Sequence, residues 1–169
     1  VSQLKITNNS SAPKTLSIFS YVEWCLWNAD DDSRNFQRNY STGEVEVVDS
    51  TIFHKTEYRE RRNHYAIYSV NAKIDGFDTI REAFLGAYHG AYEPEAVKNG
   101  ACTNSVASGW QPIASHQINV TLQPGETKSY VFRENTLLTL IGSLVGLVLG
   151  HYLHAFVMSQ IQIDAIAFD

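Results

Sequence analysis

Apolar and polar residues alternate along much of the chain before residue 133, and this pattern predicts short β-strands. Leu4 and Ile6 alternate with polar neighbours, TNNSSAPK at residues 7–14 supplies turn residues, and an apolar pattern resumes over residues 16–22. A strand, a turn and a second strand in this order predict a β-hairpin at the start of the chain.

The same pattern recurs further along the chain. Residues 44–47 alternate, VDS at 48–50 predicts a turn, and residues 51–58 carry β-branched and aromatic side chains at alternate positions. Strands are also expected at residues 64–70, 117–122 and from 129, with a turn at QPGE 123–126 and short helices at 79–88 and 94–98. Such a series of short strands predicts a mainly β fold, an antiparallel β-sandwich.

The C-terminal part of the chain has a different pattern. Residues 137–158, LLTLIGSLVGLVLGHYLHAFVM, contain no Asp, Glu, Lys or Arg. As a helix, this 22-residue stretch would span a hydrocarbon layer of roughly 30 Å, and its glycines at every fourth position would line one face. The pattern favours one transmembrane helix, with a buried element of a soluble core as the alternative. We expect two parts, 1–132 and 133–169.

Composition narrows the class of protein. A length of 169 residues allows one domain with an appendage, and a net charge of −5 argues against a nucleic-acid partner. Cys25 and Cys102 are far apart and lack the spacing of a metal site or a disulfide framework. The chain begins at Val1 within an alternating pattern, so we expect a sandwich truncated at its start.

The residues offer few candidates for catalysis. Glu23 and the run Asp30–Asp32 are the candidate carboxylates for the acid and base of glycoside cleavage. Three adjacent aspartates, however, are more typical of a solvated loop or a helix cap. The arginines of residues 59–62 would split between two faces of a strand, which favours ion pairs over an anion site. The histidines lack metal-ligand spacing. We expect no metal site, and binding is favoured over catalysis.

The string NFQRN at residues 35–39 places an aromatic ring, an amide and a guanidinium side by side. An amide both donates to and accepts from a sugar hydroxyl, and a guanidinium presents a rigid fork of donors. These residue types are also ordinary in loops. The string alone therefore does not decide between a sugar site and a loop without a binding role.

Four longer strings resemble the amino-terminal β-sandwich of the cellobiose and chitobiose phosphorylases of glycoside hydrolase family 94. They are SIFSYVEWCLWNADDDSRNFQRNYSTGEVEV, IFHKTEYRERRNHYAIYSVN, GFDTIREAFLG and SVASGWQPIASHQINVTLQPGETK. The resemblance covers residues 1–132 and implies a supersandwich, a cytoplasmic enzyme, a plausible homodimer, and inorganic phosphate as co-substrate without another cofactor. The implied reaction is inverting phosphorolysis of a β-linked glucosyl disaccharide to α-glucose 1-phosphate and glucose.

The resemblance also implies site residues. Gln37 and Arg38 would contact the acceptor-side sugar of the disaccharide with Phe36 packed beneath them. The three tryptophans, Trp24, Trp27 and Trp110, could either stack on sugar rings or pack in the core of the sandwich. In the family the general-acid aspartate lies in an (α/α)6 barrel, which this sequence lacks, so no catalytic residue is expected and the chain alone is expected to be inactive.

The tail resembles a different family. RENTLLTLIGSLVGLVLGHYLHAFVMSQIQIDAIAFD, residues 133–169, is similar to a membrane segment of the FtsX-like permeases of ABC exporters. This resemblance implies inner-membrane anchoring and suggests a fusion or chimeric junction near Arg133. An alternative function is therefore a membrane-anchored carbohydrate-binding or interaction module without catalysis.

Overall fold

The computed structural model describes residues 1–25, 30, 34, 42–56, 65–134 and 146–158. The chain divides into two compact units, Val1–Glu134 and Asn135–Asp169, which we call the sandwich unit and the tail unit. Each is described by itself.

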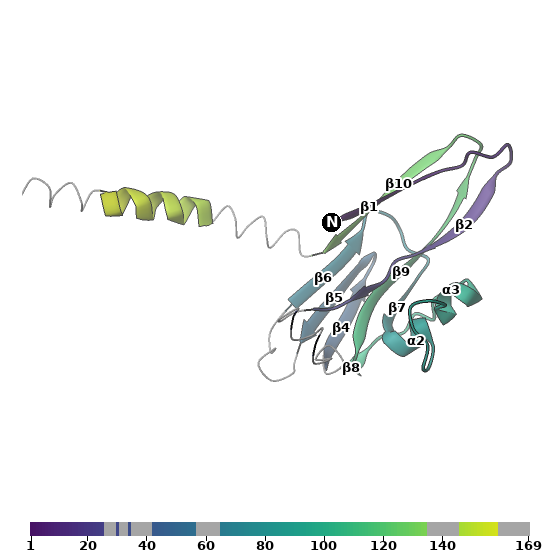
Figure 1. The fold of residues 1–169 in the computed structure, drawn as a ribbon, viewed down its shortest axis with the longest axis horizontal. Coiled ribbons are helices and arrows are strands. Elements are labelled where there is room, and N and C mark those ends of the chain that lie inside the picture. Colours follow the sequence, from purple (N-terminus) through teal and green to yellow (C-terminus); the bar gives the residue numbers. More distant parts are fainter. Residues whose placement is uncertain (26–29, 31–33, 35–41, 57–64, 135–145, 159–169) are drawn as a thin grey trace, which may run out of the picture. The chain divides into compact units, whose positions relative to one another are not determined.

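Antiparallel strands in two sheets build the sandwich unit, so the predicted mainly β architecture is confirmed (Figure 1). The larger sheet has the order β1-β10-β6-β5-β4-β8, and in the smaller sheet β9 pairs with β2, β3 and β7. The larger sheet comprises β1 (Ser2–Thr7), β4 (Thr42–Val48), β5 (Thr51–Thr56), β6 (Tyr65–Val70), β8 (Ser108–Trp110) and β10 (Thr127–Glu134). The smaller sheet comprises β2 (Lys14–Phe19), β3 (Val22–Glu23), β7 (Gly76–Ile80) and β9 (Pro112–Leu122).

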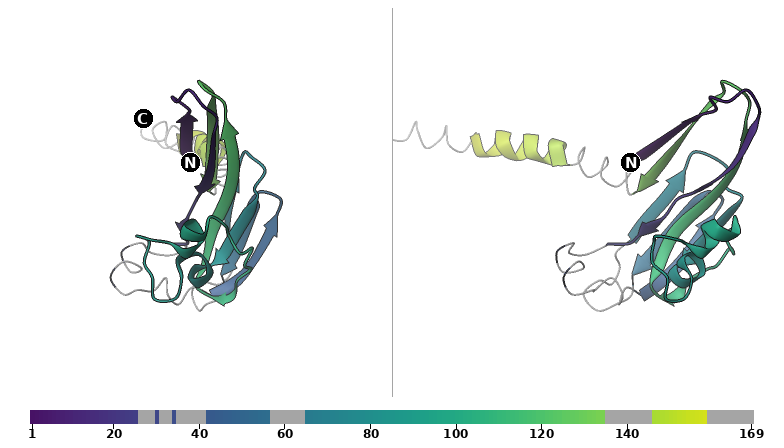
Figure 2. Two further views of the ribbon diagram at one scale, coloured as in Figure 1. Left: turned by 90° about the vertical axis from the view of Figure 1, so that its right-hand side faces the viewer. Right: turned by 45° about the vertical axis from the view of Figure 1, so that its right-hand side comes forward.

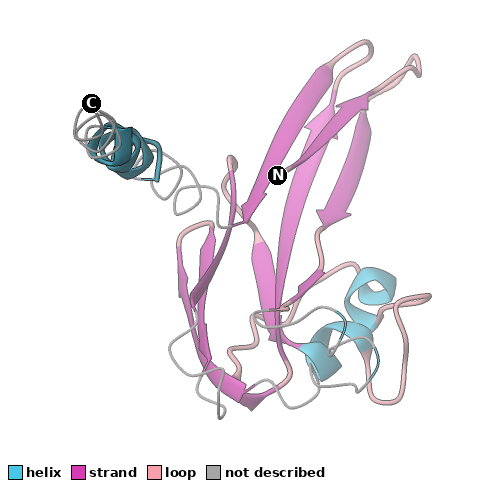
Figure 3. Ribbon diagram, turned by 60° about the vertical axis from the view of Figure 1, so that its left-hand side comes forward, coloured by secondary structure: helices cyan, strands magenta, loops and turns pink. Residues whose placement is uncertain are grey.

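The hairpin predicted at the start of the chain is wrong. β1 pairs with β10 and β2 pairs with β9, so the turn between the first two strands carries the chain from one sheet to the other. The four strands extend together beyond the rest of the unit (Figure 3). Asn8 joins the two turns at their tip, because its backbone N–H donates to Glu126 O and its Nδ2 donates to Leu122 O. A local turn signal marks the reversal, but a long-range contact decides the partner strand.

The hairpin predicted at residues 44–58 is confirmed over its described part. β4 and β5 pair from Gly43 opposite Thr56 to Val48 opposite Thr51. The turn places Asp49 at φ 52°, a left-handed conformation that aspartate tolerates better than most residues. β6 pairs with β5 on the other side, as expected for the strand at residues 64–70.

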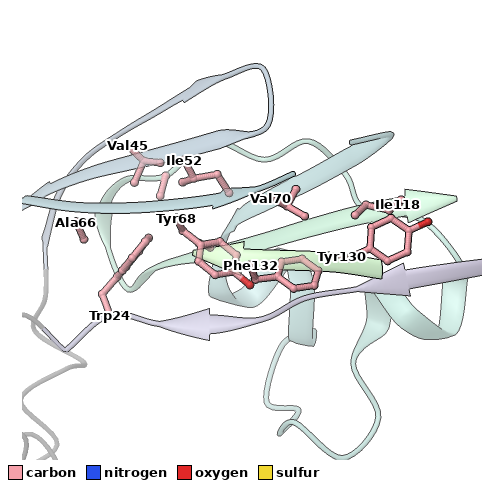
Figure 4. Packing of buried hydrophobic residues seen from close by; sticks show 11 residues of the cluster. Trp24, Val45, Ile52, Ala66, Tyr68, Val70, Ile118, Tyr130 and Phe132 are labelled. Atoms are coloured by element: carbon pink, nitrogen blue, oxygen red, sulfur yellow. The ribbon is translucent and has the colours of Figure 1, made fainter. Parts of the chain in front are cut away.

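The main core lies between the two sheets and is formed by inward-facing residues at alternate strand positions (Figure 4). Tyr68 is near its centre and stacks on Phe132 with ring centroids 6.2 Å apart. The buried members of this cluster are Trp24, Val45, Ile52, Ala66, Tyr68, Val70, Ala107, Ala114, Ile118, Tyr130 and Phe132. Alternation in β5 and β6 therefore predicts the buried face correctly.

A second, smaller core lies under two short helices, α2 (Arg81–Leu85) and α3 (Glu95–Asn99), on the side of the smaller sheet (Figure 2). Phe84, Leu85 and Ala96 from the helices pack on Ile113 of β9. Both predicted helices exist, but Thr79 and Ile80 belong to β7 and not to a helix. The first part of β9, residues 112–118, is buried on both faces because a core lies on each side of it.

The transmembrane helix expected over residues 137–158 is not supported. In the tail unit the described helical residues are 146–158. No helix within the described part of the chain is long and apolar enough to cross a membrane. Residues 135–145, where the expected span begins, lie outside the described residues.

Candidate functional site

The structure describes the attachment points of the NFQRN segment and not the segment itself. Phe36, Gln37, Arg38 and Trp27 lie outside the described residues, as do the arginines of residues 59–62. The segment follows β3 and precedes β4, whose first residue, Thr42, pairs with Trp110 of β8. β8 therefore lies directly beside the first residues of β4, the strand that follows the NFQRN segment in the sequence.

Trp24 does not meet the expectation of a sugar-stacking side chain. It is 2% exposed and packs in the main core. Its ring stacks on His54 at 5.7 Å between centroids and meets Tyr68 edge-on at 6.5 Å. Both neighbours cover the indole, so no ring face is left for a sugar. Trp24 therefore packs in the core, which was the alternative to sugar stacking.

Glu23 anchors the strand that leads into the NFQRN segment. The Tyr21 hydroxyl donates to Glu23 Oε1 at 2.5 Å, and Arg81 Nε donates to the same oxygen at 3.0 Å. Burial, assisted by the hydrogen bond to Glu23, raises the pKa of Tyr21, whose ring also stacks on Phe84. Glu23 thus ties β3 to the start of α2, an arrangement suited to positioning rather than proton transfer.

We expect the Glu23–Arg81 pair to contribute modestly to stability. In a double-mutant cycle with Glu23→Gln and Arg81→Gln, a coupling of about 1 kcal/mol is expected, because the pair is half-buried and charge-assisted. The exposed pair Lys128–Glu126, 3.7 Å apart, is the control and should give a smaller coupling. Urea unfolding of the single and double variants measures both. Equal couplings would contradict the anchoring role.

Asp78 organises the loop that leads to β8. Its carboxylate is fully buried, and Oδ1 accepts from Thr103 Oγ1 at 2.6 Å and from Ser105 Oγ at 2.8 Å. The backbone N–H groups of Thr103 and Ser105 also donate to it, each at 3.1 Å. Thr79 Oγ1 continues the network by accepting from Ala107 N at 2.7 Å. The position of β8, beside β4, therefore depends on one buried carboxylate.

Two buried histidines, His54 and His116, pack against aromatic residues of the main core. Burial lowers the pKa of His116 to about 4 and also lowers the pKa of His54. His116 stacks on Tyr68 at 5.0 Å, and His54 Nδ1 lies 3.1 Å from the carbonyl oxygen of Glu44. Both rings are therefore neutral at pH 7. Within the described ranges, no group of three or more potential metal-ligating side chains comes together.

The larger sheet also carries a concave site, which we call the sheet groove. Its volume is about 580 Å³, within the range of small-molecule sites. The groove is lined by residues of β4, β5 and β6 and by the segment that enters β8: Glu44, Val45, Glu46, Phe53, His54, Lys55, Tyr65, Ala66, Ile67, Val106, Ala107 and Ser108. No sequence motif marks it, because strand register brings these residues together. Its acids, Glu44 and Glu46, belong to β4, and its aromatic residues, Phe53 and Tyr65, belong to β5 and β6.

Two antiparallel sheets around one core, with a helical layer on the smaller sheet, define the chain's first 134 residues as a β-sandwich domain. The family model of the glycosyl hydrolase 94 supersandwich domain matches residues 1–135, and the chain belongs to this family. The predicted resemblance of residues 1–132 is thereby confirmed.

Several curated proteins are similar to the chain over this region. The N,N′-diacetylchitobiose phosphorylase of Vibrio furnissii is 32% identical over 129 residues, which are 73% of this chain and 16% of the relative. The solabiose phosphorylase of Paenibacillus borealis is 28% identical over 128 residues, 74% of this chain and 16% of the relative. The cyclic β-(1,2)-glucan synthase NdvB of Rhizobium meliloti is 27% identical over 131 residues, 77% of this chain and 4% of the relative. The chain thus spans about one sixth of the length of the phosphorylases it matches.

Proposed function

We propose that the sandwich unit is the carbohydrate-facing domain of an inverting disaccharide phosphorylase. The reaction of such an enzyme joins inorganic phosphate to the donor sugar of a β-linked disaccharide and releases the acceptor sugar. The observation that carries the proposal is the supersandwich match over residues 1–135, together with relatives that are named as phosphorylases over the same region. Phosphate is itself the nucleophile, so one general acid suffices for the chemistry.

In this proposal the domain supplies one wall of the sugar pocket. Gln37 and Arg38 contact the acceptor-side sugar, and Phe36 packs beneath them. The chemistry fits, since amide and guanidinium groups make several hydrogen bonds to neighbouring hydroxyls. Support comes from the rigid attachments on both sides of the segment, Glu23 before it and β4 paired with β8 after it. The general acid and most phosphate contacts belong to a barrel that residues 1–169 do not include.

Saccharide binding and turnover by the purified chain test this proposal separately. With the acceptor sugar as probe, Arg38→Ala and Gln37→Ala should each weaken binding about tenfold, the effect of losing one charge-assisted or bidentate contact. Arg34→Ala is the matched control, because it removes a guanidinium from the same stretch and should leave affinity unchanged. Binding is followed by ligand-observed NMR with glucose, N-acetylglucosamine, cellobiose and N,N′-diacetylchitobiose.

Turnover is followed as phosphate-dependent release of a sugar 1-phosphate from each disaccharide. The chain alone should give none, since the general acid is absent from it in this proposal. Release of glucose 1-phosphate by the chain alone would overturn the division of roles. Unchanged binding in both the Arg38→Ala and the Gln37→Ala variants would remove NFQRN from the sugar pocket.

A further inference from the structure

The floor of the sheet groove consists of two rows of outward-facing side chains. Strand register places Glu44 opposite Lys55 and Lys55 opposite Tyr65, which forms the first row. In the second row Glu46 is opposite Phe53, and Phe53 is opposite Ile67. Directly opposed residues lie about 5 Å apart, and neighbouring rows about 7 Å apart. Each row therefore combines a carboxylate with an apolar or aromatic side chain.

Two aromatic rings are unusually accessible for a sheet face. Phe53 is 38% exposed and Tyr65 is 56% exposed, and they lie diagonally across β5 and β6. A pyranose ring has one face of C–H groups, which packs on an aromatic ring, and a rim of hydroxyls, which donate to carboxylates. Glu44 and Glu46 are both exposed on the neighbouring strand and supply such acceptors.

The charges on the floor favour a neutral ligand. Among the described lining residues, two carboxylates and one lysine leave a net charge of −1, which disfavours anions such as phosphate or an acidic sugar. A peptide is also disfavoured as an added strand, because β8 already occupies the edge of β4 at Thr42–Glu44. Ser108 adds a hydroxyl at this wall, opposite Glu44. The remaining class that matches the aromatic rings and the acceptors is a neutral saccharide.

We propose that the sheet groove is a second saccharide site, which binds a neutral oligosaccharide of at least two pyranose rings. Tyr65 and Phe53 stack on the sugar faces, and Glu44 and Glu46 accept from hydroxyls. The volume of about 580 Å³ and the diagonal spacing of the two rings fit consecutive sugars. The described lining residues do not include NFQRN, and the site involves no chemical step, so the proposal does not rest on the phosphorylase reaction. Its function is to hold a chain or a second disaccharide beside the sandwich.

Titration of the full chain with cellotetraose, followed by ligand-observed NMR, tests the second site. Tyr65→Ala and Glu46→Gln should each weaken binding about tenfold or more. Tyr92→Ala is the matched control for an exposed tyrosine, and Glu82→Gln is the control for an exposed acid; both should leave binding unchanged. Arg38→Ala should also leave cellotetraose binding in the groove unchanged, which separates this site from the sugar pocket of the proposed function.

The specificity of the groove follows from a second titration. A disaccharide that contains glucuronic acid should bind more weakly than cellobiose, because it places a negative charge next to Glu44 and Glu46. Absence of saturable binding, or binding that is lost in Arg38→Ala and retained in both Tyr65→Ala and Glu46→Gln, would overturn the proposal. Equal or tighter binding of the acidic disaccharide would overturn the assignment of a neutral ligand. Circular dichroism of Glu46→Gln, an exposed substitution, verifies that a loss of binding is not a loss of fold.

Discussion

Replacing Asp78 by alanine is expected to lower the free energy of unfolding by about 4 kcal/mol. The carboxylate is fully buried and accepts from the hydroxyls and the backbone N–H groups of Thr103 and Ser105. Each hydrogen bond to a charged group contributes about 1.5–3 kcal/mol, and buried donors left without an acceptor add their own cost. The contributions share one acceptor, so the total is smaller than the sum over four donors.

Urea unfolding of the full chain measures this effect. Asp78→Asn is the informative second variant, because its amide oxygen still accepts at Oδ1 but without charge, and a loss of about 2 kcal/mol is expected. Glu82→Ala, an exposed substitution on α2, should stay within about 0.5 kcal/mol of the parent chain. If Asp78→Ala lies as close to the parent as Glu82→Ala does, the network does not hold the loop before β8.

Acidification is expected to destabilise the sandwich unit through His116. Burial holds the pKa of His116 at about 4 in the folded chain, whereas an unfolded histidine has a pKa of about 6.5. The unfolded state therefore binds the proton first, and the stability present above pH 6.5 is lost as the pH falls toward 4. The complete loss is about 3 kcal/mol, of which about half occurs by pH 5. The lowered pKa of His54 acts in the same direction.

Urea unfolding at several pH values between 7.5 and 5 tests this dependence. His116→Phe retains a ring that can stack on Tyr68 and removes the titrating group, so its stability should fall less steeply with acidification. His89→Gln, at an exposed position between α2 and α3, should follow the parent chain. Parallel curves for the parent and His116→Phe would show that His116 does not carry the acid sensitivity.

Half-buried strands are the part of the fold that sequence predicts well. In β5 and β6 buried positions alternate with more exposed ones because one side of the sheet faces the core and the other faces the groove. The turn at residues 123–126 is predicted because Pro124 and Gly125 fit it, with Gly125 at φ 76°. Local rules suffice where the decisive contacts are local.

Strands that are buried on both faces are not predicted by the alternation of apolar and polar residues. The strand predicted at residues 117–122 begins too late, because the first half of β9 contains Ser115, His116 and Gln117, which are polar yet all buried. Gln117 Oε1 accepts from Cys102 N at 2.8 Å, a contact between segments distant in sequence. Gln117 also donates from Nε2 to the carbonyl oxygen of Gly100, so the partners of its buried amide come from another segment, and a one-dimensional pattern does not contain those contacts.

The candidate sites also differ in how far the sequence predicts them. NFQRN became a candidate sugar contact through its resemblance to a family, and it stays a prediction because residues 35–39 lie outside the described part of the chain. Trp24 shows that residue type alone is a weak guide, since its ring is consumed by core packing. The sheet groove was invisible in the sequence because its acids and aromatics come from three strands aligned by register.

β9 has a consequence beyond its own burial. One strand contributes Ala114 and Ile118 to the main core and Ile113 to the core under the helices. The helical layer and the two sheets are therefore built on one shared strand. A change in the packing of Phe84 or Leu85 on Ile113 acts on the same backbone that presents Ala114 to the main core, so the two cores share a structural element.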